Sequence, residues 1–333
     1  MLALQLARDN DTELLEAWLE APRSSEAPWN FVTREIATRA CAPLVERARL
    51  MGLACAEANE RPEPDSPWVR VHSVRSPAAE PPLARPPLVV DLSSLWAGPL
   101  AGDLLRIAGA DVIKVEATGR PDGARRGPAA FFDAVNAGKR SVALDFTTAH
   151  GVSALRRLLA AADIVIEASR PRALSQLGID AREVVASAPG KTWLSITGYG
   201  RELPFGDWIA FGDDASVAAG VSAALHRQEG EWLFCGDALA DPLTGTHAAF
   251  AALASCASGG GNLLELSLRG VTARVLDRSA NLPTSHVQRT RSGDFELVGE
   301  GPGTTPIERP RLRERSAPAA ALGADTTAVL ESL

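Results

Sequence analysis

Residues 88–116 read LVVDLSSLWAGPLAGDLLRIAGADVIKVE: an apolar run, a helix-compatible stretch and a second apolar run. We predict a strand at each end and a helix from Pro99 to Ala108 between them. The same alternation continues downstream through SVALDF (141–146), a helical stretch over 151–162, DIVIEAS (163–169) and WLSITGYG (193–200). Such alternation predicts parallel strands with right-handed crossovers, and hence a doubly wound α/β sheet. Ligands bind such sheets beyond the carboxyl ends of the strands.

The chain beyond residue 200 continues with mixed elements. We expect a helical stretch over Asp214–Leu225, an apolar strand over Trp232–Cys235, a helix over Pro242–Cys256 and a strand LLELSL (263–268). The run Gly259–Gly261 precedes a strand, whereas a phosphate loop follows one and opens a helix, so we interpret it as a hairpin turn. The tail is expected to be an irregular wrap with one hairpin and a last helix after Gly323.

The chain before residue 88 has a different character. Residues 1–60 predict amphipathic helices, one with Leu14, Leu15, Trp18 and Leu19 on a single face and another over about Phe31 to Met51. Eight prolines between Pro62 and Pro87 exclude a continuous helix there, although Trp68–Val74 alternates like one strand. We therefore divide the chain into a small, mainly helical region (1–60), a proline-rich linker (61–87), a doubly wound α/β large domain (88–278) and a C-terminal wrap with a terminal helix (279–333).

Composition excludes several classes of protein. With 46% hydrophobic and 23% charged residues, the 333-residue chain is typical of a soluble globular protein. It shows neither an uninterrupted apolar membrane span nor a secretory leader, so we expect a cytoplasmic protein. A net charge of −7 argues against binding to nucleic acid or to an anionic membrane. The four cysteines, Cys41, Cys55, Cys235 and Cys256, have neither zinc-site nor disulfide-framework spacing.

Missing motifs narrow the chemistry further. The first strand is followed by DLSSLWAGPLAGDLL and not by GxGxxG, which disfavours NAD. P-loop, HExxH and GxSxG patterns are absent, and the five histidines are scattered, so no metal site and no Ser-His-Asp triad is indicated.

Acidic residues near predicted strand ends remain as candidates for catalysis. Asp237 lies in FCGDALADP (234–242), after a predicted strand and directly after Gly236, where backbone can approach a ligand closely. A carboxylate there is partly desolvated yet reachable, as a carboxylate nucleophile requires. Asp241 directly precedes Pro242, which predicts a helix N-cap.

Five blocks in this order resemble family III CoA-transferases, the group of formyl-CoA:oxalate and carnitine CoA-transferases and methylacyl-CoA racemases. The resemblance covers about residues 88–278. The blocks are residues 91–116, FFDAVNAGKRSVALDF (131–146), ADIVIEASRPRALSQLGID (162–180), ITGYG (196–200) and CGDALADPLTGTHAAFAALAS (235–255).

The resemblance implies a CoA-binding Rossmann-like large domain, a smaller domain and a homodimer whose two chains are interlinked. It also implies that Asp237 is the nucleophile. Its carboxylate would attack an acyl-CoA thioester and form a mixed anhydride, then an aspartyl-CoA thioester, from which an acceptor carboxylate takes the CoA. This route needs neither NAD nor a metal. Asp213 lies near the second acidic position of the family, with Asp214 as the alternative.

The resemblance also implies a set of CoA contacts. Arg170 and Arg172 flank Pro171 at a strand's carboxyl end and are expected to hold phosphates. Arg125, Lys139 and Arg140 would add phosphate charge, although a solvated turn accounts equally well for Lys139 and Arg140. The remaining matched positions are Leu95, Trp96, Ala97, Leu144, Ala168 and Ser169.

Departures from the family pattern leave three functions open. The usual small-domain segment is absent after residue 278, and we expect residues 1–60 to replace it and cover the acyl end of the CoA site. The first reading is a CoA-transferase. The second is an acyl-CoA racemase or isomerase that uses Asp237 and Asp213. Racemases of the group have a histidine directly before this aspartate, whereas this chain has Gly212, which argues against the second reading. The third is a non-catalytic CoA-binding subunit. The sequence identifies neither acyl donor nor acceptor.

Overall fold

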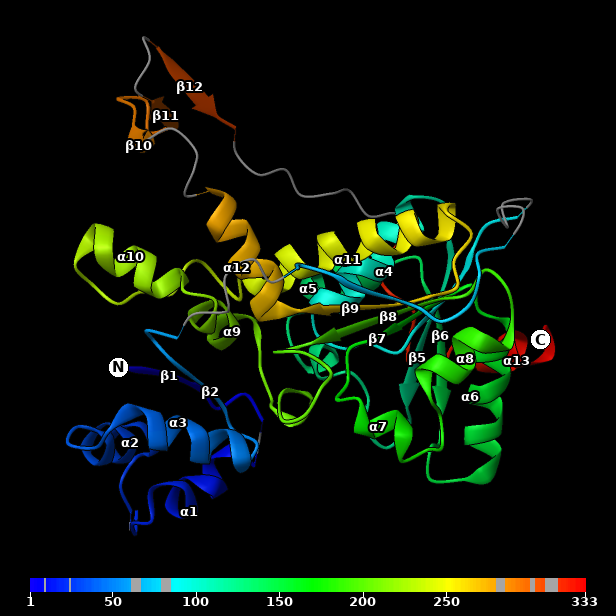
Figure 1. The fold of residues 1–333 in the computed structure, drawn as a ribbon, viewed down its shortest axis with the longest axis horizontal. Helices are drawn as coiled ribbons and strands as arrows, with labels where there is room; N and C mark the ends of the chain where they lie inside the picture. Colours follow the sequence, from blue (N-terminus) through cyan, green and yellow to red (C-terminus); the bar gives the residue numbers. More distant parts are fainter. Residues whose placement is uncertain are drawn as a thin grey trace.

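The computed structural model describes residues 1–8, 10–23, 25–60, 67–78, 85–279, 285–299, 303–308 and 317–333, and the findings below refer to these. Its centre is a seven-stranded sheet of order β3-β9-β8-β7-β4-β5-β6, shown in Figure 1. All neighbours pair in parallel except β3, which is antiparallel to β9 at the edge. The predicted α/β fold is confirmed. The strands are β3 (Arg70–Ser73), β4 (Leu88–Asp91), β5 (Asp111–Ala117), β6 (Arg140–Leu144), β7 (Ile164–Glu167), β8 (Thr192–Thr197) and β9 (Asn262–Ser267).

The strand order creates a switch point in the middle of the sheet. The parallel part of the sheet starts at β4, adds β5 and β6 on one side, and then crosses to add β7, β8 and β9 on the other. The loops that leave the carboxyl ends of β4 and β7 therefore diverge, which opens a crevice between them.

Helices cover both faces of this sheet (Figure 1). Successive strand residues point to opposite faces, so Val89 joins the core under α4 and α11, whereas Val90 joins the core under α6 and α8. On the first face lie α4 (Ala97–Ile107), α5 (Ala129–Asn136), α11 (Ala240–Ala257) and α12 (Leu268–Ser279). On the second lie α6 (Ala149–Ala161), α7 (Arg172–Ser175), α8 (Ala181–Ser187) and α13 (Thr326–Glu331).

Residues 1–60 form a separate unit with its own core, in which Leu15, Trp18, Leu19 and Phe31 are fully buried. The unit is not purely helical, because β1 (Leu2–Gln5) and β2 (Ala54–Glu57) pair in an antiparallel ribbon. The single helix expected over 31–51 is two helices, broken between residues 37 and 40. The helices of the unit are α1 (Leu15–Leu19), α2 (Pro28–Ile36) and α3 (Cys41–Leu50), preceded by the 3-10 turn η1 (Asp11–Leu14).

Several local predictions are corrected. Residues 232–235 form no strand, and the helix expected over 214–225 is α9 (Gly212–Ala218) and α10 (Val221–Glu229), separated at Gly220 with φ +97°. Gly259–Gly261 is not a hairpin turn, because it joins α11 to β9, which pairs in parallel with β8.

The remaining elements agree more closely with expectation. The strand expected over 68–74 is confirmed as β3, and the hairpin expected in the tail has a third strand. These strands are β10 (Ser285–Arg289), β11 (Phe295–Gly299) and β12 (Thr304–Ile307). None of the helices in the described ranges has the length and apolar character needed to cross a membrane.

Candidate active site

A cavity of about 830 Å³ lies at the carboxyl ends of β4, β7 and β8, across the switch point of the sheet. The loop after β4 contributes Leu95 and Trp96, and the loop after β7 contributes Ala168 to Arg170. The start of α9 contributes Gly212 to the cavity wall, and the turn before α11 contributes Asp237. The sheet topology thus builds the pocket where open α/β sheets bind ligands.

Asp241 is the pocket carboxylate that the backbone orients. It lies in the first turn of α11, which begins at Ala240, so the N-cap prediction is wrong. Its Oδ1 accepts a hydrogen bond from the Ala97 N–H at 3.2 Å, and the Gly212 N–H bonds to the same carboxylate. Burial raises the pKa of Asp241 to about 6, the two backbone bonds oppose the shift, and the charges of Asp213 and Asp237 add to it.

Two helix N-termini converge on this carboxylate, because Ala97 is the first residue of α4 and Gly212 the first of α9. The amino end of a helix carries partial positive charge and unpaired N–H groups. Close packing of α11 against the start of α4 brings Asp241 near Ala97, because a Cβ on Gly245 of α11 would lie only 2.6 Å from the Ala97 carbonyl oxygen.

Asp237 lines the same cavity but is held differently. It is exposed, on a turn between Gly236 (φ +67°) and Ala238 (φ +47°). Its carboxylate has no hydrogen bond or ion pair to any of the described residues. The left-handed conformation of Ala238 costs about 1 kcal/mol, and strained backbone of this kind gathers at functional sites.

Asp213 and Asp214, the two alternatives for the second acid, lie outside the residues that line the cavity. Asp213 is hydrogen-bonded to the turn that carries Asp237 and to the N-terminal unit: its Oδ1 accepts from the Ala238 N–H at 2.8 Å and its Oδ2 from Gln5 Nε2 at 3.1 Å. Asp214 is fully buried and caps α9 by accepting from the Phe211 N–H at 2.7 Å. Burial raises the pKa of Asp214 to about 8.

Four arginines give the cavity a positive rim: Arg8, Arg120, Arg170 and Arg172. Burial is the largest cause that lowers the pKa of Arg170, and the positive charges of Arg172, Arg8 and Arg120 lower it further. The four guanidiniums are therefore close enough to interact. Arg172 has one exposed ion pair, with Asp207 at 3.4 Å. Clustered guanidiniums suit phosphate or carboxylate groups.

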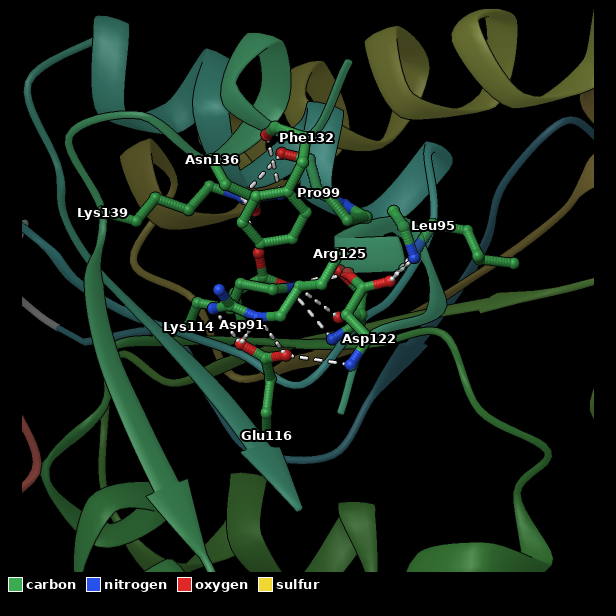
Figure 2. A network of polar contacts seen from close by, with 12 residues as sticks. Asp91, Leu95, Pro99, Lys114, Glu116, Asp122, Arg125, Phe132, Asn136 and Lys139 are labelled. Atoms are coloured by element: carbon green, nitrogen blue, oxygen red, sulfur yellow. Dashed lines mark hydrogen bonds and ion pairs between the residues drawn. The ribbon is translucent and has the colours of Figure 1, made fainter. Parts of the chain in front are cut away.

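A buried polar network holds the loop after β4 in place (Figure 2). Leu95 adopts φ +68°, and its N–H donates to Asp122 Oδ1 at 3.0 Å. Lys114 pairs with Asp122 Oδ2 at 2.9 Å and donates to the Ser93 carbonyl at 2.9 Å. These contacts fix the strained backbone that presents Leu95 and Trp96 to the cavity.

The same network contains two residues predicted to hold phosphates. Lys139 is buried and donates to Asp91 Oδ2 and to the Pro99 carbonyl, both at 2.8 Å (Figure 2). Burial alone would raise the pKa of Asp91, but the ammonium charges hold it below its ordinary value. Arg125 pairs with Glu116 at 2.6 Å. Both cations pair with internal carboxylates and lie outside the residues that line the cavity.

Arg140 and Leu144, two further predicted CoA contacts, also lie outside the cavity lining. Arg140 begins β6, at the amino edge of the sheet, and forms an exposed pair with Asp111. The pocket lies at the opposite, carboxyl edge. Leu144 ends β6 but is 5% exposed and belongs to the core under α6.

The other predicted site residues come together in the cavity: Asp237, Leu95, Trp96, Ala97, Ala168, Ser169, Arg170 and Arg172. Sequence reasoning missed Asp241, Arg8, Arg120, Phe131 and Trp208, which line it too. Two of them had a signal in the sequence: Asp241 lies in the same FCGDALADP block as Asp237, and Phe131 begins the block 131–146. Among the described residues no three His, Cys, Asp or Glu side chains form a group able to hold a metal ion.

These features define an α/β protein with an arginine-rimmed, carboxylate-containing pocket at the switch point of its sheet. The sequence profile of CoA-transferase family III matches residues 87–299, and the chain belongs to this family. The predicted resemblance is confirmed.

Named relatives agree with this assignment. A succinate–glutarate CoA-transferase of Agrobacterium fabrum is 33% identical over 216 residues, 59% of this chain and 54% of that protein. A formyl-CoA:oxalate CoA-transferase of Escherichia coli is 30% identical over 174 residues, 50% and 42% of the two chains. The chain thus spans about half the length of these relatives. The crystal structure of the hypothetical protein Rv3272 from Mycobacterium tuberculosis superposes with a TM-score of 0.57 at 28% identity, covering 68% of this chain and 65% of that one.

Proposed function

We propose that this protein is a CoA-transferase that moves CoA from an acyl-CoA thioester to a carboxylate acceptor through an aspartyl intermediate. The observation that supports it most is the Asp241 carboxylate, held by two helix N-termini inside a pocket with an arginine rim. Membership of CoA-transferase family III and the named activities of its relatives support the same reaction class.

CoA would enter with its phosphates at the rim. Arg170 and Arg172 follow β7 and offer forked donors for phosphate oxygens. The pantetheine arm would run along Leu95 and Trp96, bringing the thioester to the start of α4. Trp96 packs edge-on against Phe131, with ring centroids 5.1 Å apart, so this wall of the acyl end is aromatic.

Two carboxylates compete for the covalent role, and the geometry favours Asp241 over the predicted Asp237. A nucleophile must keep one orientation through several steps, and Asp241 is fixed by the Ala97 and Gly212 N–H groups. An anhydride on the exposed Asp237 would meet water and hydrolyse. We assign Asp237 to the wall of the pocket, where its charge helps to keep the pKa of Asp241 raised.

The transfer proceeds in four steps. An Asp241 oxygen attacks the thioester carbonyl, the C–S bond breaks, and an acyl-aspartyl anhydride and CoA thiolate form. The thiolate attacks the Asp241 carbonyl carbon and releases the acyl group as a carboxylate. The acceptor carboxylate then attacks the aspartyl thioester and expels the thiolate, forming a second anhydride. The thiolate finally attacks the acceptor's acyl carbon, which yields the new CoA thioester and restores the Asp241 carboxylate.

Backbone groups would stabilise the charge that develops in the second and third steps, in which the Asp241 carbonyl carbon is attacked. In these two steps the Asp241 carbonyl oxygen turns into the oxyanion of the tetrahedral intermediate. The N–H groups of Ala97 and Gly212 already contact this carboxylate, so they would need little rearrangement to stabilise the oxyanion. A side chain at Gly212 would collide with Asp241, so glycine permits this approach.

Two isosteric variants test the proposal. Asp241→Asn removes the attacking charge at constant size and should lower turnover by at least 1,000-fold, on the order of what loss of a covalent nucleophile costs, while CoA binding stays within a few fold. Asp237→Asn is the matched control from the same turn and should keep more than a tenth of wild-type turnover. Succinyl-CoA and formyl-CoA, each with a panel of carboxylates, are the donors to assay by mass detection of new thioesters. Loss of turnover in Asp237→Asn alone would return the nucleophile to Asp237.

One observation favours a second function, acyl-CoA racemisation. A pKa of about 6 is well suited to a group that exchanges protons near neutral pH, and Asp237 stands beside Asp241 as a partner. Deuterium uptake at the α-carbon of an acyl-CoA, without any new thioester, would identify this reaction.

The assembly forms part of the same proposal. We propose a homodimer, supported by the family resemblance, with residues 1–60 in place of the family's small domain. Light scattering on the full chain should give twice the monomer mass, and a monomeric mass at micromolar concentration would contradict it.

A further inference from the structure

Arg8 is the one cavity-lining residue contributed by the N-terminal unit among the described residues. It lies between β1 and η1, nearly eighty residues before the segment that matches the family profile. Family membership therefore gives this side chain no role. Its position raises the question of why a separate unit should place a cation on the rim of the pocket.

The N-terminal unit is fastened to the large domain next to the cavity. Ala3 and Ala56 pack in one apolar cluster with Tyr199 and Val217. Arg49 lies over the Trp208 ring at 4.3 Å, and Trp208 itself lines the cavity. Because these contacts are buried, the unit has a defined position relative to the pocket.

Arg8 is held in place from inside its own unit. Its Nε donates to Asp11 Oδ1 at 2.8 Å, and its Nη2 donates to the Gly52 carbonyl at 2.6 Å. Asp11 is 1% exposed, so this side of the guanidinium is rigidly anchored. Gly52 lies against Ile209, another residue of the cavity wall. The Nη1 group forms no hydrogen bond within the described chain.

We propose that Arg8 binds a phosphate of CoA together with Arg170, so that the N-terminal unit completes the CoA site. The inference rests on the proposed function, since it takes CoA as the ligand. Four guanidiniums at one rim exceed what a single acyl carboxylate needs, whereas the nucleotide end of CoA carries a pyrophosphate and a 3′-phosphate. The anchored fork of Arg8 loses little conformational entropy when it binds such an oxyanion.

Calorimetric titration of the full-length protein with CoA tests this directly. Arg8→Ala should weaken CoA binding about tenfold or more, as expected for the loss of a charge-assisted hydrogen bond. Because Arg8 also anchors Asp11 and Gly52, Arg8→Gln serves as a second variant that keeps an amide donor but removes the charge, and it should show the same loss. Arg39→Ala is the matched control: this arginine of the same unit bonds the Leu19 carbonyl, outside the cavity, and its loss should change CoA affinity by less than twofold.

Two truncated ligands identify the phosphate. If Arg8 holds the 3′-phosphate, wild type and Arg8→Gln bind 3′-dephospho-CoA equally. If it holds the pyrophosphate, the penalty persists with 3′-dephospho-CoA and disappears with pantetheine. CoA affinity within twofold of wild type in Arg8→Gln, or an undiminished penalty with pantetheine, overturns the inference. A wild-type protein that binds no CoA contradicts the proposed function itself.

Discussion

Replacing Lys139 by methionine should destabilise the protein strongly and leave CoA affinity unchanged. The Lys139 and Asp91 side chains are 1% and 0% exposed and pair at 2.8 Å. Without the ammonium, Asp91 keeps Ser93 as a hydrogen-bond donor but loses its main counter-charge. Breaking one side of a buried ion pair costs about 3–5 kcal/mol, a large share of the roughly 5–15 kcal/mol that keeps a domain folded.

The neighbouring residue provides the matched control. Arg140 pairs with Asp111 at the surface, with the two side chains 37% and 49% exposed, so Arg140→Met should cost about 0–1 kcal/mol. Urea unfolding measures both free energies, and calorimetry measures CoA affinity. Adding Asp91→Asn to Lys139→Met should recover part of the loss by removing the unpaired charge. A Lys139→Met protein within about 1 kcal/mol of wild type would refute the reasoning, and a tenfold loss of CoA affinity at unchanged stability would restore the phosphate role.

Three further outcomes follow from the same geometry. The kcat/KM of transfer should rise with pH around a midpoint near 6, because Asp241 attacks only when ionised, and a profile flat from pH 5 to 8 would contradict this. Gly245→Ala places a methyl group 2.6 Å from the Ala97 carbonyl oxygen and should lower the free energy of unfolding in urea by about 1–3 kcal/mol. Gly119 faces open space, so Gly119→Ala should change this free energy by less than about 0.5 kcal/mol. The pKa of Asp214 is raised from 3.8 to about 8, so the stability that the protonated Asp214 contributes is full below its ordinary pKa and is lost as the pH rises through about 8. Asp214→Asn should therefore flatten the pH dependence of the free energy of unfolding in urea over this window. An unchanged pH dependence would argue against the raised pKa.

The sheet was predictable from sequence because its signal is local. β4 and β7 are apolar runs that end in an acidic residue, and a loop follows each carboxyl end, so the alternation alone places Trp96 and Arg170 at the same edge of the sheet. The N-terminal ribbon carries no such signal. Its strands LALQ and ACAE have four residues each, contain no β-branched residue and pair across about fifty positions.

Site residues were predictable only where their partners lie nearby in sequence. Asp241 has the local pattern of an N-cap, but its hydrogen-bond donor is Ala97, 144 positions away. Lys139 resembles a solvated turn residue, and only packing against α4 buries it beside Asp91. Arg8 reaches the cavity through contacts between the N-terminal unit and the large domain. In each case a long-range contact decides the role, and one sequence alone does not show it.

The identity of the covalent carrier is tested most directly by trapping the intermediate. The protein is incubated with an acyl-CoA donor that supports turnover, quenched with hydroxylamine and digested, and the peptide containing Asp237 and Asp241 is sequenced by mass spectrometry. Fragment ions between the two aspartates assign the hydroxamate to one side chain. We predict the modification on Asp241, and its absence from Asp241→Asn treated in the same way. A hydroxamate on Asp237, or steady turnover with no modified aspartate, would contradict the account.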